Sequence, residues 1–240
     1  GMELGEIWGY HVVGLFAPDE EAQEWGLKAQ EKTFWSGDNK SWNAGDLKFA
    51  DLDESGVVDN GSNRLDDHGD LRKIGNSSPR YHYGINFSAN WNGIDFAVFF
   101  QGVGNVNFFT NNTYTQPFTA SSISLSNVFT DLIGKYWSES NPDPNARYPR
   151  LTTSPNPNNS QKSTFWMVNG RYMRLKNAEI GYSLPKQVVN KLRIDGLRIY
   201  VSGMNLLTFS DFKLWDPDLQ TGAANYPNNR VYNIGVSLIF

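Results

Sequence analysis

The sequence contains no cysteine in its 240 residues. This absence excludes the disulfide framework typical of small secreted domains, and it excludes thiolate metal sites and cysteine nucleophiles. The chain also has no run of about 18 apolar residues, so it predicts no transmembrane helix. Strands of membrane barrels need only about 9–11 residues of alternating polarity, so the absence of a long apolar run does not exclude a membrane barrel.

Positive charge and targeting signals are scarce as well. The formal net charge is −4, and we expect no nucleic-acid partner because phosphate binding requires a dense basic face. The first four residues carry neither basic residues nor an apolar stretch, so the sequence predicts no signal peptide here. Aromatic residues make up 14% of a chain that is only 39% hydrophobic, which favours alternating polarity over a single apolar core.

One stretch alternates almost perfectly between apolar and polar residues. From Tyr81 to Trp91 every odd position is apolar or aromatic and every even position is small or polar, which predicts a strand. Asn92-Gly93 follows, and this pair is typical of a two-residue hairpin turn because both central residues need positive φ. Residues 94–101 alternate again, so the segment predicts a β-hairpin with one apolar face.

Three more strands are predicted towards the C-terminus, over residues 172–184, 197–207 and 231–240. The last one ends in an aromatic residue with apolar residues at every second position before it, a pattern that predicts a signal for insertion into an outer membrane. The edge strand of a soluble antiparallel sandwich is the alternative. The residues of the predicted insertion signal are Tyr232, Ile234, Val236, Leu238 and Phe240.

The connections between these strands differ greatly in length. The turn at 92–93 and the connection 185–196 are short, whereas residues 1–80, 102–171 and 208–230 are long and irregular. If the last strand runs towards the periplasm, every long connection falls on the extracellular side and both short ones on the periplasmic side. Outer-membrane barrels have this asymmetry, whereas such long loops are uncommon in compact domains.

Several segments together resemble the SusC/RagA family of TonB-dependent outer-membrane transporters of Bacteroidetes. They occur in the order found in that family and span nearly the whole chain. The segments are Ile7-Trp8-Gly9-Tyr10, Gly14-Leu15-Phe16, residues 44–53, Ile74 to Tyr81, Phe99 to Gly104, Tyr136-Trp137, Tyr148-Pro149-Arg150-Leu151, Tyr172 to Asn177, Gly203 to Thr208, Asp216-Pro217-Asp218 and Tyr226-Pro227.

The resemblance implies an all-β fold, with about five C-terminal strands of a 22-stranded transmembrane barrel. Residues 1–80 would form an extracellular loop region, and residues 81–240 would carry the strands and the extracellular loops 102–171 and 208–230. The chain would then be a fragment, because a plug and an N-terminal segment that contacts TonB have no counterpart in it. The edges of five strands alone would lack partners in lipid.

The resemblance also implies a function. The parent protein would import a nutrient, an oligosaccharide or less readily a peptide, through the outer membrane of a Gram-negative cell. Its partners would be a SusD-like surface lipoprotein, TonB and the surrounding lipid. The alternative function is a secreted, soluble β-sandwich that binds glycans, and dependence on detergent separates the two.

An acidic segment before the first of these strands looks like a calcium loop of the EF-hand type. Residues 51–59 read Asp-Leu-Asp-Glu-Ser-Gly-Val-Val-Asp, and this spacing directs several oxygens at one centre, as calcium requires. Val58 would pack inward. The expected ligands are Asp51, Asp53, Ser55, the carbonyl oxygen of Val57, and Asp59.

The loop departs from that pattern at its twelfth position. Ser62 stands where a bidentate acidic residue is expected, and Asp66, Asp67 or Asp70 would have to supply the missing carboxylate. The alternative is a solvated acidic turn that holds no ion. The sequence thus offers one possible cofactor, a structural calcium ion, on a predicted extracellular loop.

Catalytic motifs are missing from the sequence. His11, His68 and His82 are scattered without a nucleophile or carboxylate at motif spacing, so we expect no enzyme. Arg174 and Lys176 are expected to face the lumen or to form ion pairs with neighbouring strands. Loop packing or an interfacial position, rather than a ligand contact, is expected for Trp8, Trp25, Trp35, Trp42, Trp137, Trp166 and Trp215.

Overall fold

The computed structural model describes residues 2–17, 21–22, 24, 43–112, 115, 129–152, 156–220 and 225–240. The chain divides into two compact units. Unit 1 comprises Gly1–Ser78 and Asn107–Val168, and unit 2 comprises Pro79–Val106 and Asn169–Phe240. Within the described ranges, every helix is too short or too polar to cross a membrane.

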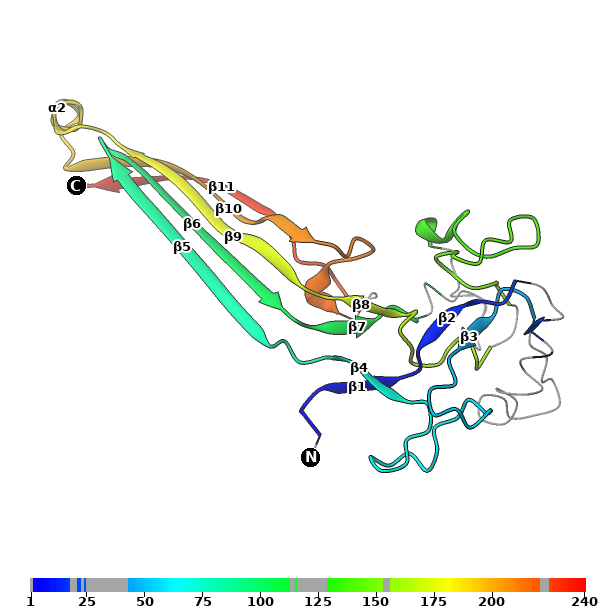
Figure 1. Cartoon of the computed structure of the whole chain (residues 1–240). Helices are drawn as coiled ribbons and strands as arrows, with labels where there is room; N and C mark the ends of the chain where they lie inside the picture. Colours follow the sequence, from blue (N-terminus) through cyan, green and yellow to red (C-terminus); the bar gives the residue numbers. More distant parts are fainter. Residues whose placement is uncertain are drawn as a thin grey trace. The chain divides into compact units, whose positions relative to one another are not determined.

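Unit 2 is built on a five-stranded antiparallel sheet with the strand order β11-β10-β9-β6-β5 (Figure 1). Long strands of alternating polarity were predicted at all five places, and the prediction is confirmed. Their ends differ from the predicted ones by up to three residues. The strands are β5 Tyr81–Trp91, β6 Ile94–Gly104, β9 Tyr172–Ser183, β10 Gly196–Ser210 and β11 Val231–Ile239.

The short connections of unit 2 meet at one end of the sheet. Asn92 and Gly93 both have positive φ, 49° and 83°, as a tight hairpin turn requires. The connection between β9 and β10 contains α2 Lys186–Val189 and η4 Asn190–Leu192, and it lies at the same end as the C-terminus (Figure 1). The long connections after β6 and β10 leave from the opposite end, as predicted from their lengths.

The register of the strands gives the sheet an apolar face and a polar face. The apolar face is exposed along its length, and the exposed fraction reaches 81% at Ile234. So many exposed apolar side chains on one face indicate a surface that a membrane or another protein covers. Among the residues of the apolar face are Ile85, Phe87 and Trp91 of β5, Ile94 and Phe96 of β6, Ile180 and Tyr182 of β9, Ile199 and Val201 of β10, and Tyr232, Ile234, Val236 and Leu238 of β11.

The polar face carries amides, hydroxyls and charges. Arg198 on β10 donates hydrogen bonds to Asp95 on β6 and, at 2.6 Å, to Glu179 on β9. Its guanidinium also lies 4.9 Å from the ring centre of Tyr200, an attractive cation–π distance. One arginine thus ties three strands together on this face.

Unit 1 contains short strands where the sequence predicted only irregular segments. Strands of three to five residues are too short for alternation to reveal them, and here the prediction was wrong. β1 Glu6–Gly9 pairs with β4 Arg72–Asn76, β2 Val12–Leu15 with β3 Leu47–Phe49, and β7 Asn107–Phe109 with β8 Met167–Asn169. The 3-10 turns are η3 Thr130–Leu132 in unit 1 and η5 Pro217–Leu219 in unit 2.

Aromatic and aliphatic side chains form the core of unit 1. Its fully buried members include Phe16, Phe49, Val58, Tyr148 and Trp166. Trp137 is buried in the same cluster. These two tryptophans pack in a core, as predicted, whereas Trp25, Trp35 and Trp42 lie outside the described residues.

A buried carboxylate fixes the loops around that core. Asp46 has no exposed surface and accepts two hydrogen bonds from Arg150, at 2.7 Å from Nε and 3.0 Å from Nη2. The side-chain amides of Asn156 and Asn159 each donate to it at 2.9 Å, and the backbone N–H of Asn43 donates at 3.1 Å. A buried charge with this many partners is a stable arrangement.

Candidate functional site

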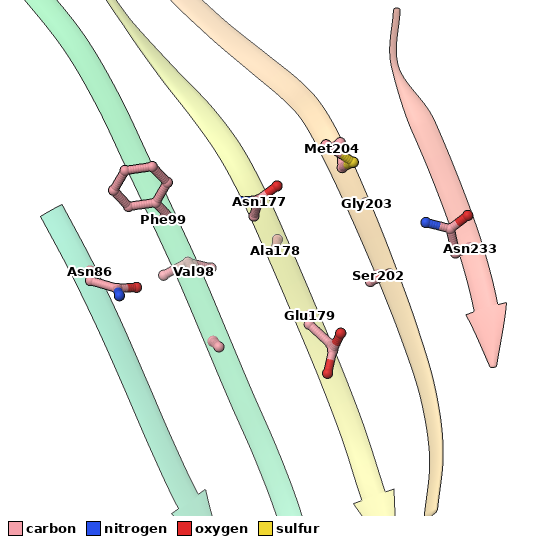
Figure 2. Close-up of a pocket in the computed structure, with 11 residues that line it drawn as sticks. Asn86, Val98, Phe99, Asn177, Ala178, Glu179, Ser202, Gly203, Met204 and Asn233 are labelled. Atoms are coloured by element: carbon pink, nitrogen blue, oxygen red, sulfur yellow. The ribbon is translucent and has the colours of Figure 1, made fainter. Parts of the chain in front are cut away.

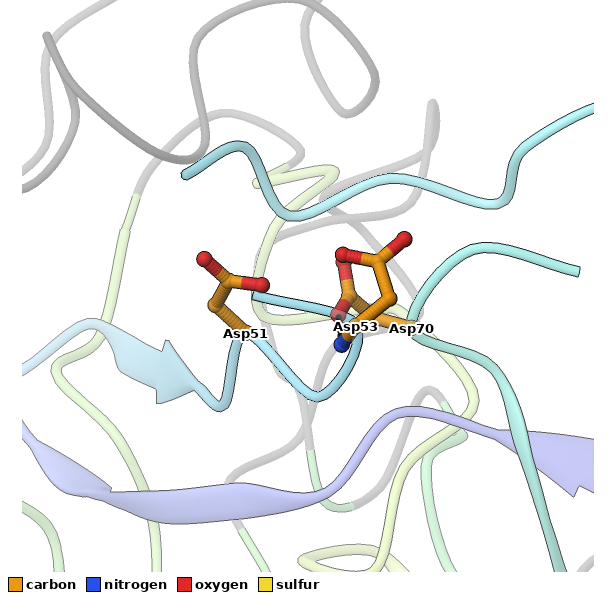
Figure 3. A group of neighbouring side chains, drawn as sticks. All are labelled: Asp51, Asp53 and Asp70. Atoms are coloured by element: carbon orange, nitrogen blue, oxygen red, sulfur yellow. Dashed lines mark hydrogen bonds between the residues drawn. The ribbon is translucent and has the colours of Figure 1, made fainter. Parts of the chain in front are cut away.

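The predicted calcium loop follows β3 directly and brings acidic side chains together. Figure 3 shows Asp51, Asp53 and Asp70, whose nearest carboxylate oxygens all lie within 4.8 Å of one another. Two of the three come from the loop 51–59, and the third comes from the turn before β4. Carboxylate oxygens gathered at one point are the ligands that calcium prefers.

The backbone of the loop curls around its own side chains. The N–H of Gly56 donates to Oδ2 of Asp51 at 2.8 Å, and the N–H of Ser55 donates to Oδ1 of Asp53 at 3.0 Å. Gly56 has φ 81°, a conformation that favours glycine. The other oxygen of Asp51, Oδ1, is buried and accepts no hydrogen bond from the described residues, which leaves one acceptor free at this point.

Asp70 is held under the loop by the backbone. Its carboxylate is buried and accepts hydrogen bonds from the N–H groups of Leu52 at 2.5 Å, Asp59 at 2.8 Å and Asp53 at 3.3 Å. Burial and the neighbouring carboxylate of Asp53 raise the pKa of Asp70, and the three hydrogen bonds oppose that rise. Without a nearby cation, this environment therefore disfavours a negative charge on Asp70 beside the negative charge of Asp53.

The other predicted ligands have different neighbours. The hydroxyl of Ser55 donates to the carbonyl oxygen of Val57 at 3.0 Å, and Oδ1 of Asp59 accepts from the N–H of Gly61 at 2.7 Å. Asp67 accepts from both the N–H and the hydroxyl of Ser62. Among the described residues, Asp66 and Asp67 lie outside the gathered group, and their role as ligands stays a prediction.

A groove runs across the polar face of unit 2. Its volume is about 640 Å³, and Figure 2 shows its side chains on β5, β6, β9, β10 and β11. Amides, one hydroxyl and one carboxylate share the walls with apolar side chains, so the groove offers hydrogen bonds rather than a reacting group. Its principal side chains are Asn86, Phe99, Asn177, Glu179, Met204 and Asn233.

The sequence alone indicated these groove residues only as members of polar rows. Glu179 and Asn233 stand at alternating positions in two predicted strands, but their meeting depends on the register between β9, β10 and β11. Ser202 aligns with both of them. The pairing of β9 with its two neighbours also shifts at a bulge near Lys176 and Asn205, which alternation does not reveal.

Unit 1 contains a smaller, mostly apolar cavity of about 150 Å³. The ring of Trp8 forms one wall, with its centre 5.3 Å from that of His68. Leu65, Leu71 and Arg64 complete much of the lining. Trp8 thus stands beside a cavity, a position its sequence context did not indicate.

The residues of the predicted insertion signal all point away from a protein core. Phe240 is 87% exposed, and the alternating side chains of β11 before it are exposed too. A soluble sandwich would enclose this row between two sheets about 10 Å apart. The residues concerned are Tyr232, Ile234, Val236, Leu238 and Phe240.

Comparison with known proteins finds relatives of this chain, although no family model matches the sequence. TonB-dependent receptor P3 of Formosa agariphila is 27% identical over 260 residues, which cover the whole chain and 22% of that receptor. TonB-dependent receptor P39 of the same organism is 25% identical and likewise matches the whole chain, with 25% of its own length covered. The chain is homologous to part of the TonB-dependent receptors.

Solved structures agree with this homology at the level of the fold. A chain of the RagAB peptide transporter matches 98% of this chain with a TM-score of 0.64 and 20% identity, and 23% of that chain is covered. The open-open state of the RagAB peptide importer gives a TM-score of 0.63 at the same identity. The resemblance to SusC/RagA-type, TonB-dependent receptors and the predicted all-β, partial-barrel fold are confirmed. The chain spans about a quarter or less of these receptors.

Proposed function

We propose that this chain forms part of the wall of a TonB-dependent nutrient importer in the outer membrane. One observation carries the proposal: a single sheet exposes apolar side chains on one face and lines a polar groove on the other. A membrane barrel requires this alternation, because its outer face meets lipid and its inner face meets water.

The soluble β-sandwich is the competing proposal, and it needs a second layer over the apolar face. Among the described residues, most large side chains of that face are exposed, from Ile85 on β5 to Ile234 on β11. An exposed apolar area of this extent on a soluble protein would promote aggregation. A sheet with such a face is stable when the face meets lipid.

Fractionation of the full-length protein tests the location. We expect it in the outer-membrane fraction, extracted only by detergent. Recovery of the native protein from the aqueous phase without detergent would favour the soluble binding module instead.

The substrate and the partners make up the finer part of the proposal. The substrate is an oligosaccharide, and a SusD-like surface lipoprotein is the partner that assists its uptake. TonB supplies energy through parts of the receptor outside this chain. The amide and carboxylate groups of the groove suit a polyhydroxylated molecule. They also suit a peptide backbone, and the similar RagAB structures are described as peptide importers, so a peptide is the second candidate.

Uptake in cells that lack the receptor gene separates the two substrates. We expect loss of uptake of labelled oligosaccharides, with uptake of labelled oligopeptides unchanged. The reverse pattern would assign the receptor to peptides. Restoring the gene must restore the affected uptake in either case.

A calcium ion on the loop 51–59 is the second proposal for this chain. Three carboxylates within 4.8 Å repel one another unless a cation lies between them, and Oδ1 of Asp51 is a buried acceptor without a hydrogen bond from the described residues. The ion would join the loop to Asp70 and thereby clamp the segment between β3 and β4. Its role is structural.

Calcium is therefore expected to stabilise the full-length protein. Saturation at about 100 times the dissociation constant adds about 2.7 kcal/mol to a native state that alone binds the ion. Isothermal titration and hydrogen exchange of residues 51–59, with and without calcium, measure this effect. Asp53→Asn is expected to abolish it.

Asp66→Asn is the matched control, because it removes one acidic charge from the same segment outside the gathered group. We expect it to retain calcium binding. Equal binding by the wild type and Asp53→Asn would exclude this ion site, and loss of binding in Asp66→Asn would return that residue to the ligand set.

A further inference from the structure

The polar face of unit 2 holds a buried arginine that neither proposal above uses. Arg174 lies near the start of β9, in register with Gln101 of β6 and Thr208 of β10. Its exposed fraction is only 2%, although a long charged side chain on the open face of a sheet normally reaches water. Residues of the connection between β10 and β11 provide its ion-pair partners.

Two carboxylates of that connection meet two side chains of β9. Arg174 donates from Nη2 to Oδ1 of Asp216, and its Nη1 lies 3.9 Å from Oδ2 of Asp218. Tyr172, two residues earlier on the same face, donates from its hydroxyl to Oδ1 of Asp218 at 2.6 Å. Asn228 donates from Nδ2 to Oδ2 of Asp218 at 3.0 Å. These five residues form what we call the loop clasp.

The turn that presents the carboxylates is itself ordered. Oδ1 of Asp216 caps η5 by accepting from the N–H of Asp218 at 3.0 Å. Burial raises the pKa of Asp216, but the hydrogen bonds from Asp218 and Arg174 outweigh it, so the pKa lies below its ordinary value. The ring of Phe212 is buried against Trp215, with the centres 4.7 Å apart. The loop therefore meets β9 as a formed structure.

The buried positive charge of Arg174 is stabilised by this loop. Its Nε and Nη1 are buried and make no hydrogen bond among the described residues, although a guanidinium carries five donors. The carboxylate of Asp216 is thus its main compensation. When a buried pair loses one partner, the remaining charge is strongly destabilised. A broken clasp should lift the loop and let water reach the arginine.

We propose that Tyr172 and Arg174 are positioning residues that hold residues 211–220 over the polar face of the sheet. The consequence for transport rests on the proposed function, in which the polar face lines the path of the substrate. There the clasped loop narrows the path and presents the partly exposed carboxylate of Asp218 to it. The segment is then a fixed part of the wall rather than a lid.

Hydrogen exchange of the amides of residues 211–220, measured in the full-length protein, tests the clasp. Arg174→Met is expected to speed this exchange about a hundredfold, because it removes one partner of a buried pair. Arg171→Met is the matched control. Arg171 pairs with Asp211 of the same loop at 2.7 Å, but both side chains are more than half exposed, so its loss should change exchange less than about fivefold.

Tyr172→Phe provides a second variant that keeps the ring and loses one hydrogen bond to a carboxylate. We expect about tenfold faster exchange of the loop, so the test remains valid if Arg174→Met fails to assemble. Exchange that is no faster in Tyr172→Phe and Arg174→Met than in Arg171→Met would overturn the clasp. Because exchange is measured without substrate, failure of the proposed import function leaves this test unaffected.

Discussion

Replacing Asp46 with alanine is expected to destabilise unit 1 by about 3–5 kcal/mol. The change leaves the guanidinium of Arg150 without its bidentate partner, and its side chain is only 23% exposed. It also removes the carboxylate that accepts hydrogen bonds from the buried side-chain amides of Asn156 and Asn159. Each unsatisfied group adds its own desolvation penalty, so this single carboxylate should be among the most sensitive positions of the unit.

Asp211→Ala is the control for that prediction. Asp211 also accepts two hydrogen bonds from one arginine, at 3.1 and 2.7 Å from Nε and Nη2 of Arg171, but this pair is exposed. Its loss should cost less than about 1 kcal/mol. The two variants therefore compare similar chemistry at different burial.

Native-state hydrogen exchange of the full-length protein measures both effects. A loss of about 3 kcal/mol corresponds to exchange that is faster by roughly a hundredfold or more. We expect this acceleration for the amides of Phe16 and Gly45, which are hydrogen-bonded beside Asp46, in Asp46→Ala. Equal, small effects of Asp46→Ala and Asp211→Ala in their own units would contradict the importance of burial here.

The long strands were predictable because each of them carries its own evidence. From Tyr81 to Trp91 the alternation spans 11 residues, and the Asn92-Gly93 turn fixes the register of the hairpin. The last strand offers the same signal, and its exposed row from Tyr232 to Phe240 confirms which face is apolar. Local pattern sufficed wherever the strand was long and the turn short.

Contacts between distant segments were not predictable in the same way. Asp46 and Arg150 belong to two separate segments of the family resemblance, and the structure joins them across 104 residues. Arg174 and Asp216, in two other such segments, meet across 42 residues. One sequence shows that these residues are present, but the path of the loops between them decides which of them pair.

The candidate calcium loop lies between these two cases. Its spacing is local, and the inward position of Val58 agrees with the burial of that side chain. The carboxylate that joins the loop comes from Asp70, 11 residues beyond Asp59 and bound to its N–H. Spacing alone left Asp66, Asp67 and Asp70 equivalent, because a turn of unknown shape separates them from the loop.

The apolar face leads to the last prediction. Ile234→Arg is expected to destabilise the full-length protein by about 2–4 kcal/mol in a lipid bilayer, because an arginine near the middle of a lipid-facing strand loses its hydration. Ile234 lies in the middle of β11 and is 81% exposed in the structure. In water, a side chain that exposed would accept arginine at almost no cost.

Asn233→Arg is the matched variant, one residue away on the opposite face. Asn233 lines the polar groove together with Glu179, so a new positive charge there meets water and a carboxylate. We expect normal assembly and stability for this variant. Unfolding in lipid vesicles, and the amount of each variant that assembles in the outer membrane, measure the difference. Equal stability of the two variants in lipid would mean that β11 does not face the bilayer. It would contradict the proposed barrel wall, because adjacent residues of a barrel strand face lipid and water in turn.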